Sequence, residues 1–117
     1  MKLTITSVDY APVELSEQLP IAVALIRPLP SSVPNRVGAW LGVFDRPVRW
    51  TNENGKTVEI THAAVWPRAK GASIGGGMRG LPVGIGYVVD QSLVDDETLD
   101  LAKTYFIAVG LASDSGR

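Results

Sequence analysis

Residues 48–66 read VRWTNENGKTVEITHAAVW and contain the clearest structural signal in the chain. Asn54-Gly55 lies between two runs of strand-forming residues, and this dipeptide suits the central positions of a tight β-hairpin turn. After the turn apolar residues alternate with polar ones, which predicts that one inner face of the second strand is shared by Val58, Ile60, His62, Ala64 and Trp66. The stretch therefore predicts an antiparallel β-protein.

Other segments on both sides of this hairpin also have the composition of strands. Residues 3–8 alternate apolar side chains with Thr and Ser, as in a half-buried strand. Residues 21–26 are apolar on both faces, which predicts a central strand in the middle of the core. Residues 37–44 form a further candidate, followed by a break at 45–47, and residues 83–89 another.

One helix signal begins near Ser92. Ser-Leu-Val-Asp fits a capping box, and the acidic residues Asp95, Asp96 and Glu97 suit the positive end of a helix dipole. From Thr104 the side chains favour a strand, although a helix running to Gly110 is the alternative. We expect a short helix followed by a last strand.

Length and composition complete the prediction of fold class. A chain of 117 residues without cysteine can bury a sufficient core as one domain, residues 1–117, and needs no disulfide. We expect a mainly β fold, either a small antiparallel barrel or a sandwich, with about six or seven strands and one short C-terminal helix. The first ten residues lack the continuous apolar stretch of a signal peptide, so we expect a cytoplasmic protein without a membrane segment.

Glycines are concentrated in one segment. Seven of the twelve lie between Gly71 and Gly86, where they permit positive φ and can turn N–H groups toward an anion. Basic residues stand close by, so the candidate residues for an anion or a partner's acidic group are Arg68, Lys70, Gly75, Gly76, Gly77 and Arg79. A plain connection between strands, or close packing at a subunit contact, is the alternative for this segment. Residues 75–80 match G-x-G-x-x-G, but no strand precedes them and no helix follows, so we expect no dinucleotide.

The sequence offers little support for catalysis. His62 is the only histidine, and its apolar neighbours predict a core or edge-of-core position with a satisfied hydrogen bond. No G-x-S-x-G motif accompanies it, and a single histidine without cysteine argues against a zinc site. We therefore predict no catalytic residue, no metal and no cofactor.

Charge is distributed unevenly along the chain. Residues 27–80 hold eight of the eleven basic side chains and three of the twelve acidic ones. This segment also holds four large aromatic residues, which a single-stranded nucleic acid could stack on: Trp40, Phe44, Trp50 and Trp66. Their places in predicted strands and the acidic remainder of the chain favour a structural role instead.

These observations lead to three hypotheses of function. The first is a non-enzymatic binding or assembly module that associates with itself, or with another protein, through complementary basic and acidic surfaces. The second is a small enzyme or carrier that holds an anionic ligand, phosphate or carboxylate, under the segment 71–86. The weakest is a module for single-stranded nucleic acid.

Overall fold

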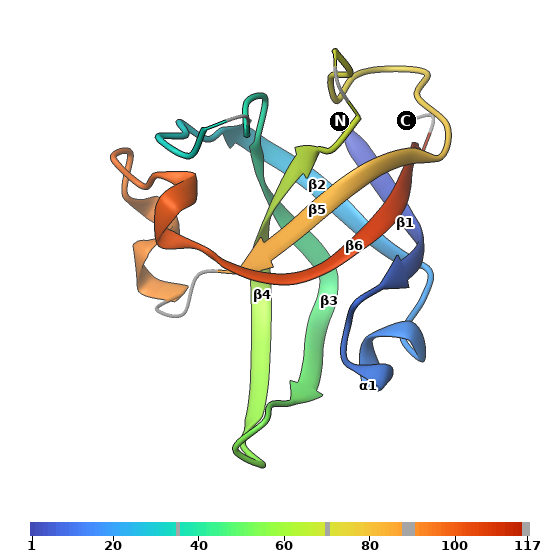
Figure 1. Cartoon of the computed structure of the whole chain (residues 1–117), viewed down its shortest axis with the longest axis vertical. Coiled ribbons are helices and arrows are strands. Elements are labelled where there is room, and N and C mark those ends of the chain that lie inside the picture. Colours follow the sequence, from blue (N-terminus) through green and yellow to red (C-terminus); the bar gives the residue numbers. More distant parts are fainter. Residues whose placement is uncertain (35, 70, 88–90, 116–117) are drawn as a thin grey trace.

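The computed structural model describes residues 1–34, 36–69, 71–87 and 91–115. In this part of the chain six strands close into an antiparallel barrel, in which each strand pairs with the next and the last pairs with the first (Figure 1). The strands are β1 (Lys2–Asp9), β2 (Ile21–Pro28), β3 (Trp40–Thr51), β4 (Thr57–Pro67), β5 (Leu81–Tyr87) and β6 (Tyr105–Asp114). The predicted β-rich class is confirmed, and of the two expected architectures the chain adopts the barrel.

Alternate apolar residues fill the barrel interior, as the pleat of a strand requires. The largest side chains that are fully buried there are Leu3, Ile5, Ile21, Val23, Val48, Val65 and Val83. Ala63, Ala108 and Ala112 are buried among them. Their small side chains suit the narrow lumen of a six-stranded barrel.

The strand expected over 21–26 is present, but only one of its faces belongs to the core. Ile21 and Val23 lie inside the barrel, whereas Ile26 keeps 49% of its surface exposed. In a closed barrel no strand is more central than another, so an apolar run does not mark the middle of a sheet. The strand expected after Thr104 is confirmed as β6.

The predicted hairpin joins β3 to β4. Thr51 pairs with Thr57, and Gly55 has φ of +74° in the turn between them. The Asn52 side chain accepts hydrogen bonds from the backbone N–H groups of Asn54 and Lys56, at 2.9 and 3.0 Å. The break expected at 45–47 does not end the strand. It is a register shift within one continuous β3.

This register shift changes which residues of β4 face inward. Val58 and Ile60 pack against the interior, but farther along Ala63 and Val65 do so, while Ala64 and Trp66 belong to a second apolar cluster. The prediction that His62, Ala64 and Trp66 share the inner face with Ile60 was therefore wrong. The irregularity in β3 lies between the residues paired with Ile60 and His62, and it moves the alternation by one position.

The second cluster lies outside the barrel, under a strap formed by residues 91–104. This strap contains two short 3-10 helices, η1 (Gln91–Asp95) and η2 (Leu101–Lys103), where the sequence predicted one helix near Ser92. Leu99 and Leu101 of the strap cover Trp66. Hydrogen bonds from the Arg27 guanidinium to the carbonyl oxygens of Val94 and Asp96, at 2.7 and 2.9 Å, hold the end of η1 and the residue after it. One turn of α-helix, α1 (Val13–Ser16), was not predicted and joins β1 to β2.

No helix among the described residues is long and apolar enough to span a bilayer.

Candidate functional site

The topology separates the loops into two groups. Both termini and the loops 29–39 and 68–80 lie at one end of the barrel, whereas the α1 loop 10–20 and the hairpin turn 52–56 lie at the other (Figure 1). Because all neighbouring strands are antiparallel, residues far apart in sequence meet at each end.

The glycine-rich segment 71–86 divides into a loop and a strand, in agreement with the strand expected from residue 83 onward. Gly84 and Gly86 lie within β5, so the loop covers residues 68–80, where Gly71, Gly77 and Gly80 have positive φ. This loop is held against the last strand. The N–H of Gly77 donates to the Asp114 carboxylate at 2.7 Å, and the N–H of Gly80 donates to the Ser113 hydroxyl at 2.8 Å.

Two further contacts fix the same loop. The N–H of Asp114 donates to the Met78 carbonyl at 2.8 Å, and the side chain of Ile74 is buried in the barrel core. The loop is thus positioned by its own protein, and the Asp114 carboxylate stands where an anion would have to approach Gly77. Repulsion between the two negative charges makes a free anion a poor ligand at this N–H.

The structure brings most of the sequence candidates to one end of the barrel. Arg68 and Arg79 are exposed at the two limits of loop 68–80, with Gly75, Gly76 and Gly77 between them. Lys70 lies outside the described residues. Whether these residues bind a partner stays a prediction.

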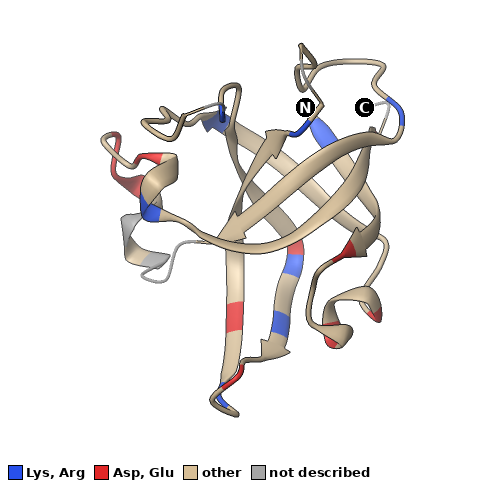
Figure 2. Ribbon diagram, in the orientation of Figure 1, with Lys and Arg blue, Asp and Glu red and all other residues tan. Residues whose placement is uncertain are grey.

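Basic residues predominate at this end. The described residues of loops 29–39 and 68–80 include Arg36, Arg68 and Arg79 and no carboxylate, and Lys2 begins β1 beside them. Figure 2 shows the blue segments on the loops and strand ends near both termini. We call this the basic end. One acidic residue, Asp114, lies close to this end as the last residue of β6. Its carboxylate accepts the hydrogen bond from the N–H of Gly77.

Acidic residues predominate at the opposite end. Loops 10–20 and 52–56 carry Glu14, Glu17 and Glu53 against the single base Lys56, and Asp9 ends β1 beside them. The Arg46 guanidinium of β3 also lies at this end, where it donates to the carbonyl oxygens of Gln18 and Pro20. We call this the acidic end. Red segments mark it in Figure 2, together with blue ones on β3 and at the hairpin tip. Further carboxylates, including Asp96 and Asp100, lie on the strap at the side of the barrel.

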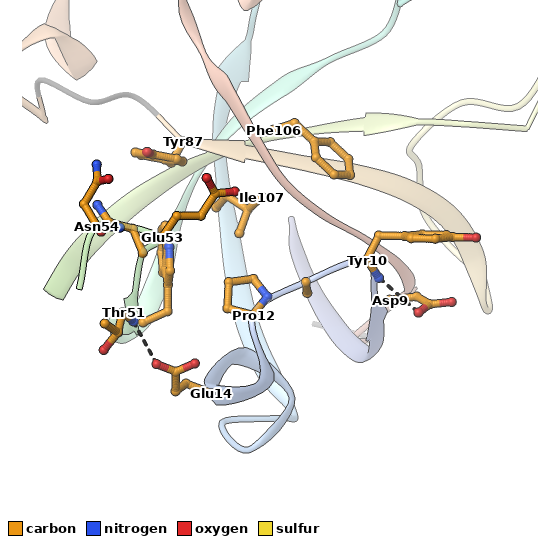
Figure 3. A pocket seen from close by; sticks show the side chains of 13 residues that line it. Asp9, Tyr10, Pro12, Glu14, Thr51, Glu53, Asn54, Tyr87, Phe106 and Ile107 are labelled. Atoms are coloured by element: carbon orange, nitrogen blue, oxygen red, sulfur yellow. Dashed lines mark hydrogen bonds between the residues drawn. The ribbon is translucent and has the colours of Figure 1, made fainter. Parts of the chain in front are cut away.

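The acidic end holds a cavity with a volume of about 760 Å³. Its walls come from the α1 loop, the hairpin and the adjoining ends of β5 and β6 (Figure 3). The lining residues include Asp9, Tyr10, Glu14, Trp50, Glu53, Tyr87 and Phe106. No lysine, arginine or histidine is among the described residues of the wall.

Aromatic rings form much of the wall. Trp50 is 6% exposed, and the ring of Tyr87 meets it edge-on, with ring centres 5.2 Å apart. Nearer the surface, Phe106 is 50% exposed and Tyr10 is 79% exposed. Tyr10 has φ of +51°, a left-handed conformation that is strained for a residue with a side chain. Its N–H donates to the Asp9 carboxylate at 3.0 Å.

The carboxylate of Glu14 is oriented by the neighbouring strand. It accepts a hydrogen bond of 2.8 Å from the N–H of Thr51, and this bond lowers the pKa of Glu14 below its ordinary value. The side chain of Gln18 ties the same loop to β3 through the N–H and carbonyl of Arg49. Glu14 therefore remains ionised at neutral pH and holds a fixed position beside the cavity.

Of the remaining sequence candidates, only Trp50 lines this cavity. His62 is half-buried on β4, where its Nδ1 lies 2.8 Å from the Thr61 hydroxyl, which agrees with the expected hydrogen bond. Phe44, Trp50 and Trp66 are buried, so their rings serve the two cores. Among the described residues no group of three potential ligands could hold a metal ion.

Sequence reasoning missed the cavity because its wall is assembled from four separate segments. Residues 9–14, 50–54, 87 and 106–107 have no common spacing in the sequence. The only local signal is Tyr105-Phe106, two large side chains at the start of a strand, of which Phe106 lines the cavity.

Comparison with protein-family models, with curated proteins and with solved structures finds no match to this chain.

Proposed function

We propose that this chain is a non-enzymatic binding module that associates with a second copy of itself, the basic end of one copy against the acidic end of the next. The observation that supports this most is the charge separation between the two ends of the barrel. Arg36, Arg68 and Arg79 belong to one pair of loops, and Glu14, Glu17 and Glu53 to the other. Such complementary potentials steer association and fix its register.

Exposed apolar side chains at the acidic end support the same proposal. Tyr10, Val13, Tyr105 and Phe106 each keep between 50% and 79% of their surface accessible in the single chain. Aromatic residues of this kind provide much of the energy of protein interfaces. Burial against a second copy would remove their apolar surface from water.

The fixed loop at the basic end favours a protein partner over a free anion. Asp114 already takes the N–H of Gly77, whereas the guanidinium groups of Arg68 and Arg79 lie on the exposed surface. A preformed loop loses little conformational freedom when it binds, which favours affinity. We also propose that the module acts in the cytoplasm, as expected from the sequence.

Light scattering across a range of salt tests this proposal. At ~0.01 M salt, where the Debye length is about 30 Å, we expect a mass above the 12.5 kDa of one chain. At ~1 M salt, where the length is about 3 Å, we expect the mass of one chain. A mass of 12.5 kDa at every salt and protein concentration overturns self-association and leaves a different protein as the partner.

A pair of charge variants supplies the matched control. The double variant Arg68→Glu, Arg79→Glu inverts charge at the basic end and should remain monomeric at low salt. The double variant Arg49→Glu, Lys56→Glu makes the same change in net charge on the half of the barrel with the acidic end, so it should associate as well as the unmodified chain or better. Equal behaviour of the two variants would show that only net charge matters, which contradicts the proposal.

A further inference from the structure

The cavity at the acidic end combines two features that contribute little to the stability of a fold. Its wall presents partly exposed aromatic rings, and the carboxylates of Asp9, Glu14 and Glu53 lie around the same opening (Figure 3). The described wall of this cavity contains no base, and Glu14 and Glu53 have none beside them there. Asp9 also lines a neighbouring hollow together with Arg68, and Tyr10 and Phe106 line another with Arg36 and Arg68. A cavity of about 760 Å³ is also within the range of ligand sites, which occur at the mouths of β-barrels.

The aromatic rings are suited to a cation. The negative face of an aromatic ring attracts a guanidinium or ammonium group that lies within about 6 Å of its centre. Tyr87 is held edge-on against Trp50 and lies 6.0 Å from the ring of Tyr105, so its orientation is fixed by its neighbours. Phe106 adds a second ring above the same space (Figure 3).

The carboxylates point to the same kind of ligand. Glu53 belongs to the hairpin turn and Glu14 to the loop across the cavity, so their charges act on one volume from two sides (Figure 3). The N–H of Thr51 keeps Glu14 in place, but a carboxylate has about four lone-pair positions and can accept further hydrogen bonds. Glu14 and Glu53 are two like charges with no base in the described wall, and this favours a positive ligand between them.

We infer that this cavity binds a guanidinium group, the side chain of an arginine, which stacks on the rings of Tyr87 or Phe106 and donates to the carboxylates of Glu14 or Glu53. Guanidinium fits better than ammonium because it is planar, is weakly hydrated and can donate two parallel hydrogen bonds to one carboxylate. The arginine has two possible sources. If it is Arg68 or Arg79 of a second copy, the inference rests on the proposed function. Free arginine or an arginine of another chain is the other source.

Titration with a single-residue probe tests the site itself. N-acetyl-arginine amide carries the guanidinium without a terminal charge, and N-acetyl-citrulline amide is its neutral isostere. Followed by NMR on the amides of residues 9–14, 50–54 and 106–107, the arginine probe should give saturable shifts, and the citrulline probe should bind at least about tenfold more weakly. Absence of saturable binding by the arginine probe, or equal binding of the two probes, overturns the inference.

Two matched glutamate variants locate the binding. Glu53→Gln removes a charge from the cavity and should weaken the arginine probe, whereas Glu59→Gln removes an exposed charge of β4 outside it and should not. Phe106→Ser, which removes a half-exposed ring, should weaken the probe as well. If Glu53→Gln and Glu59→Gln bind the probe equally, the cavity is not the site.

Competition distinguishes the two sources of the arginine. If a second copy provides it, the arginine probe should dissociate the low-salt assembly while the citrulline probe leaves it intact. Binding of the probe without loss of the assembly retains the cavity as an arginine site but assigns the ligand to another molecule. Binding of the probe by a chain that never associates would remove the proposed function and still support the site, so the two proposals fail separately.

Discussion

Gly84 illustrates how a single residue determines what the outer wall of the barrel can hold. A Cβ added there would overlap the indole ring of Trp66, which crosses β5 on the outside of the barrel. The ring is then sandwiched, because Leu99 and Leu101 of the strap belong to the same cluster and the Arg36 guanidinium lies 5.1 Å from the ring centre. Glycine is needed here for space, not for its backbone freedom.

Replacement of this glycine should therefore destabilise the whole fold. We expect Gly84→Ala to lower the free energy of unfolding by about 1–3 kcal/mol, the usual cost of overpacking a buried site. Urea denaturation followed by circular dichroism measures this difference. Gly75→Ala is the matched control, since no atom lies within 4 Å of its added Cβ. Equal losses in the two variants would show that Trp66 does not lie over Gly84.

Glu14 gives a second test on a single side chain. Its lowered pKa means that the folded chain releases this proton more readily than the unfolded chain does. The stabilising effect of the ionised carboxylate is therefore complete above about pH 4.5 and is lost as the pH falls through the folded pKa. We expect Glu14→Gln to be less stable than the unmodified chain at pH 7, with a difference that shrinks below pH 4.5.

Thermal unfolding of both proteins between pH 3 and pH 7 checks this prediction. Glu17→Gln is the control, because no hydrogen bond to the Glu17 carboxylate is found among the described residues. The pH dependence of this control is the background against which the effect of Glu14→Gln is judged. A difference for Glu14→Gln that stays constant with pH would mean that the bond from Thr51 does not distinguish the charged from the neutral side chain.

Among the elements, the strap depends on one capping side chain. The Asp100 carboxylate accepts hydrogen bonds from the N–H of Ala102 at 2.8 Å and from the N–H and hydroxyl of Ser32, both at 3.0 Å. It thus begins η2 and fastens the strap to loop 29–39 at the same time. These bonds also lower the pKa of Asp100, so it is charged at neutral pH.

Loss of this side chain should release the strap while the barrel stays folded. In Asp100→Ala we expect faster hydrogen exchange in residues 29–34 and 99–104, with unchanged protection in β1 and β2, because the strap makes no strand pairs. Mass spectrometry of peptic fragments resolves these segments. Asp95→Ala, an exposed carboxylate of the same strap, should exchange like the unmodified chain. Uniformly faster exchange in all segments would mean that strap and barrel open as one unit.

The elements also differ in how far local sequence determines them. Asn54-Gly55 specifies its hairpin because the turn needs only local backbone conformation, and residues 105–114 form a strand as their side chains favour. The inner face of β4 could not be read in this way. The alternation of β4 changes where its pairing with β3 shifts register, between Val43 and Val48. That pairing joins residues of two strands and is not visible in the local sequence of β4.

At the scale of the whole molecule, barrel closure turns an uneven charge distribution along the chain into a charge separation in space. The sequence predicted that basic and acidic surfaces exist, and it predicted the basic loop by residue. It did not predict the cavity, because only the pairing of β1 with β6 brings Tyr10 and Phe106 to the same opening. The end-to-end association proposed above would use both surfaces of each copy.

Mixing two variants, each defective at a different end, tests end-to-end association most directly. One partner carries Arg68→Glu and Arg79→Glu and keeps its acidic end, whereas the other carries Glu17→Gln and Glu53→Gln and keeps its basic end. By light scattering at low salt, each alone should have the mass of one chain, 12.5 kDa, and the mixture should contain a one-to-one pair of twice that mass. A mixture that stays at the mass of one chain, while the unmodified chain associates, would contradict the account.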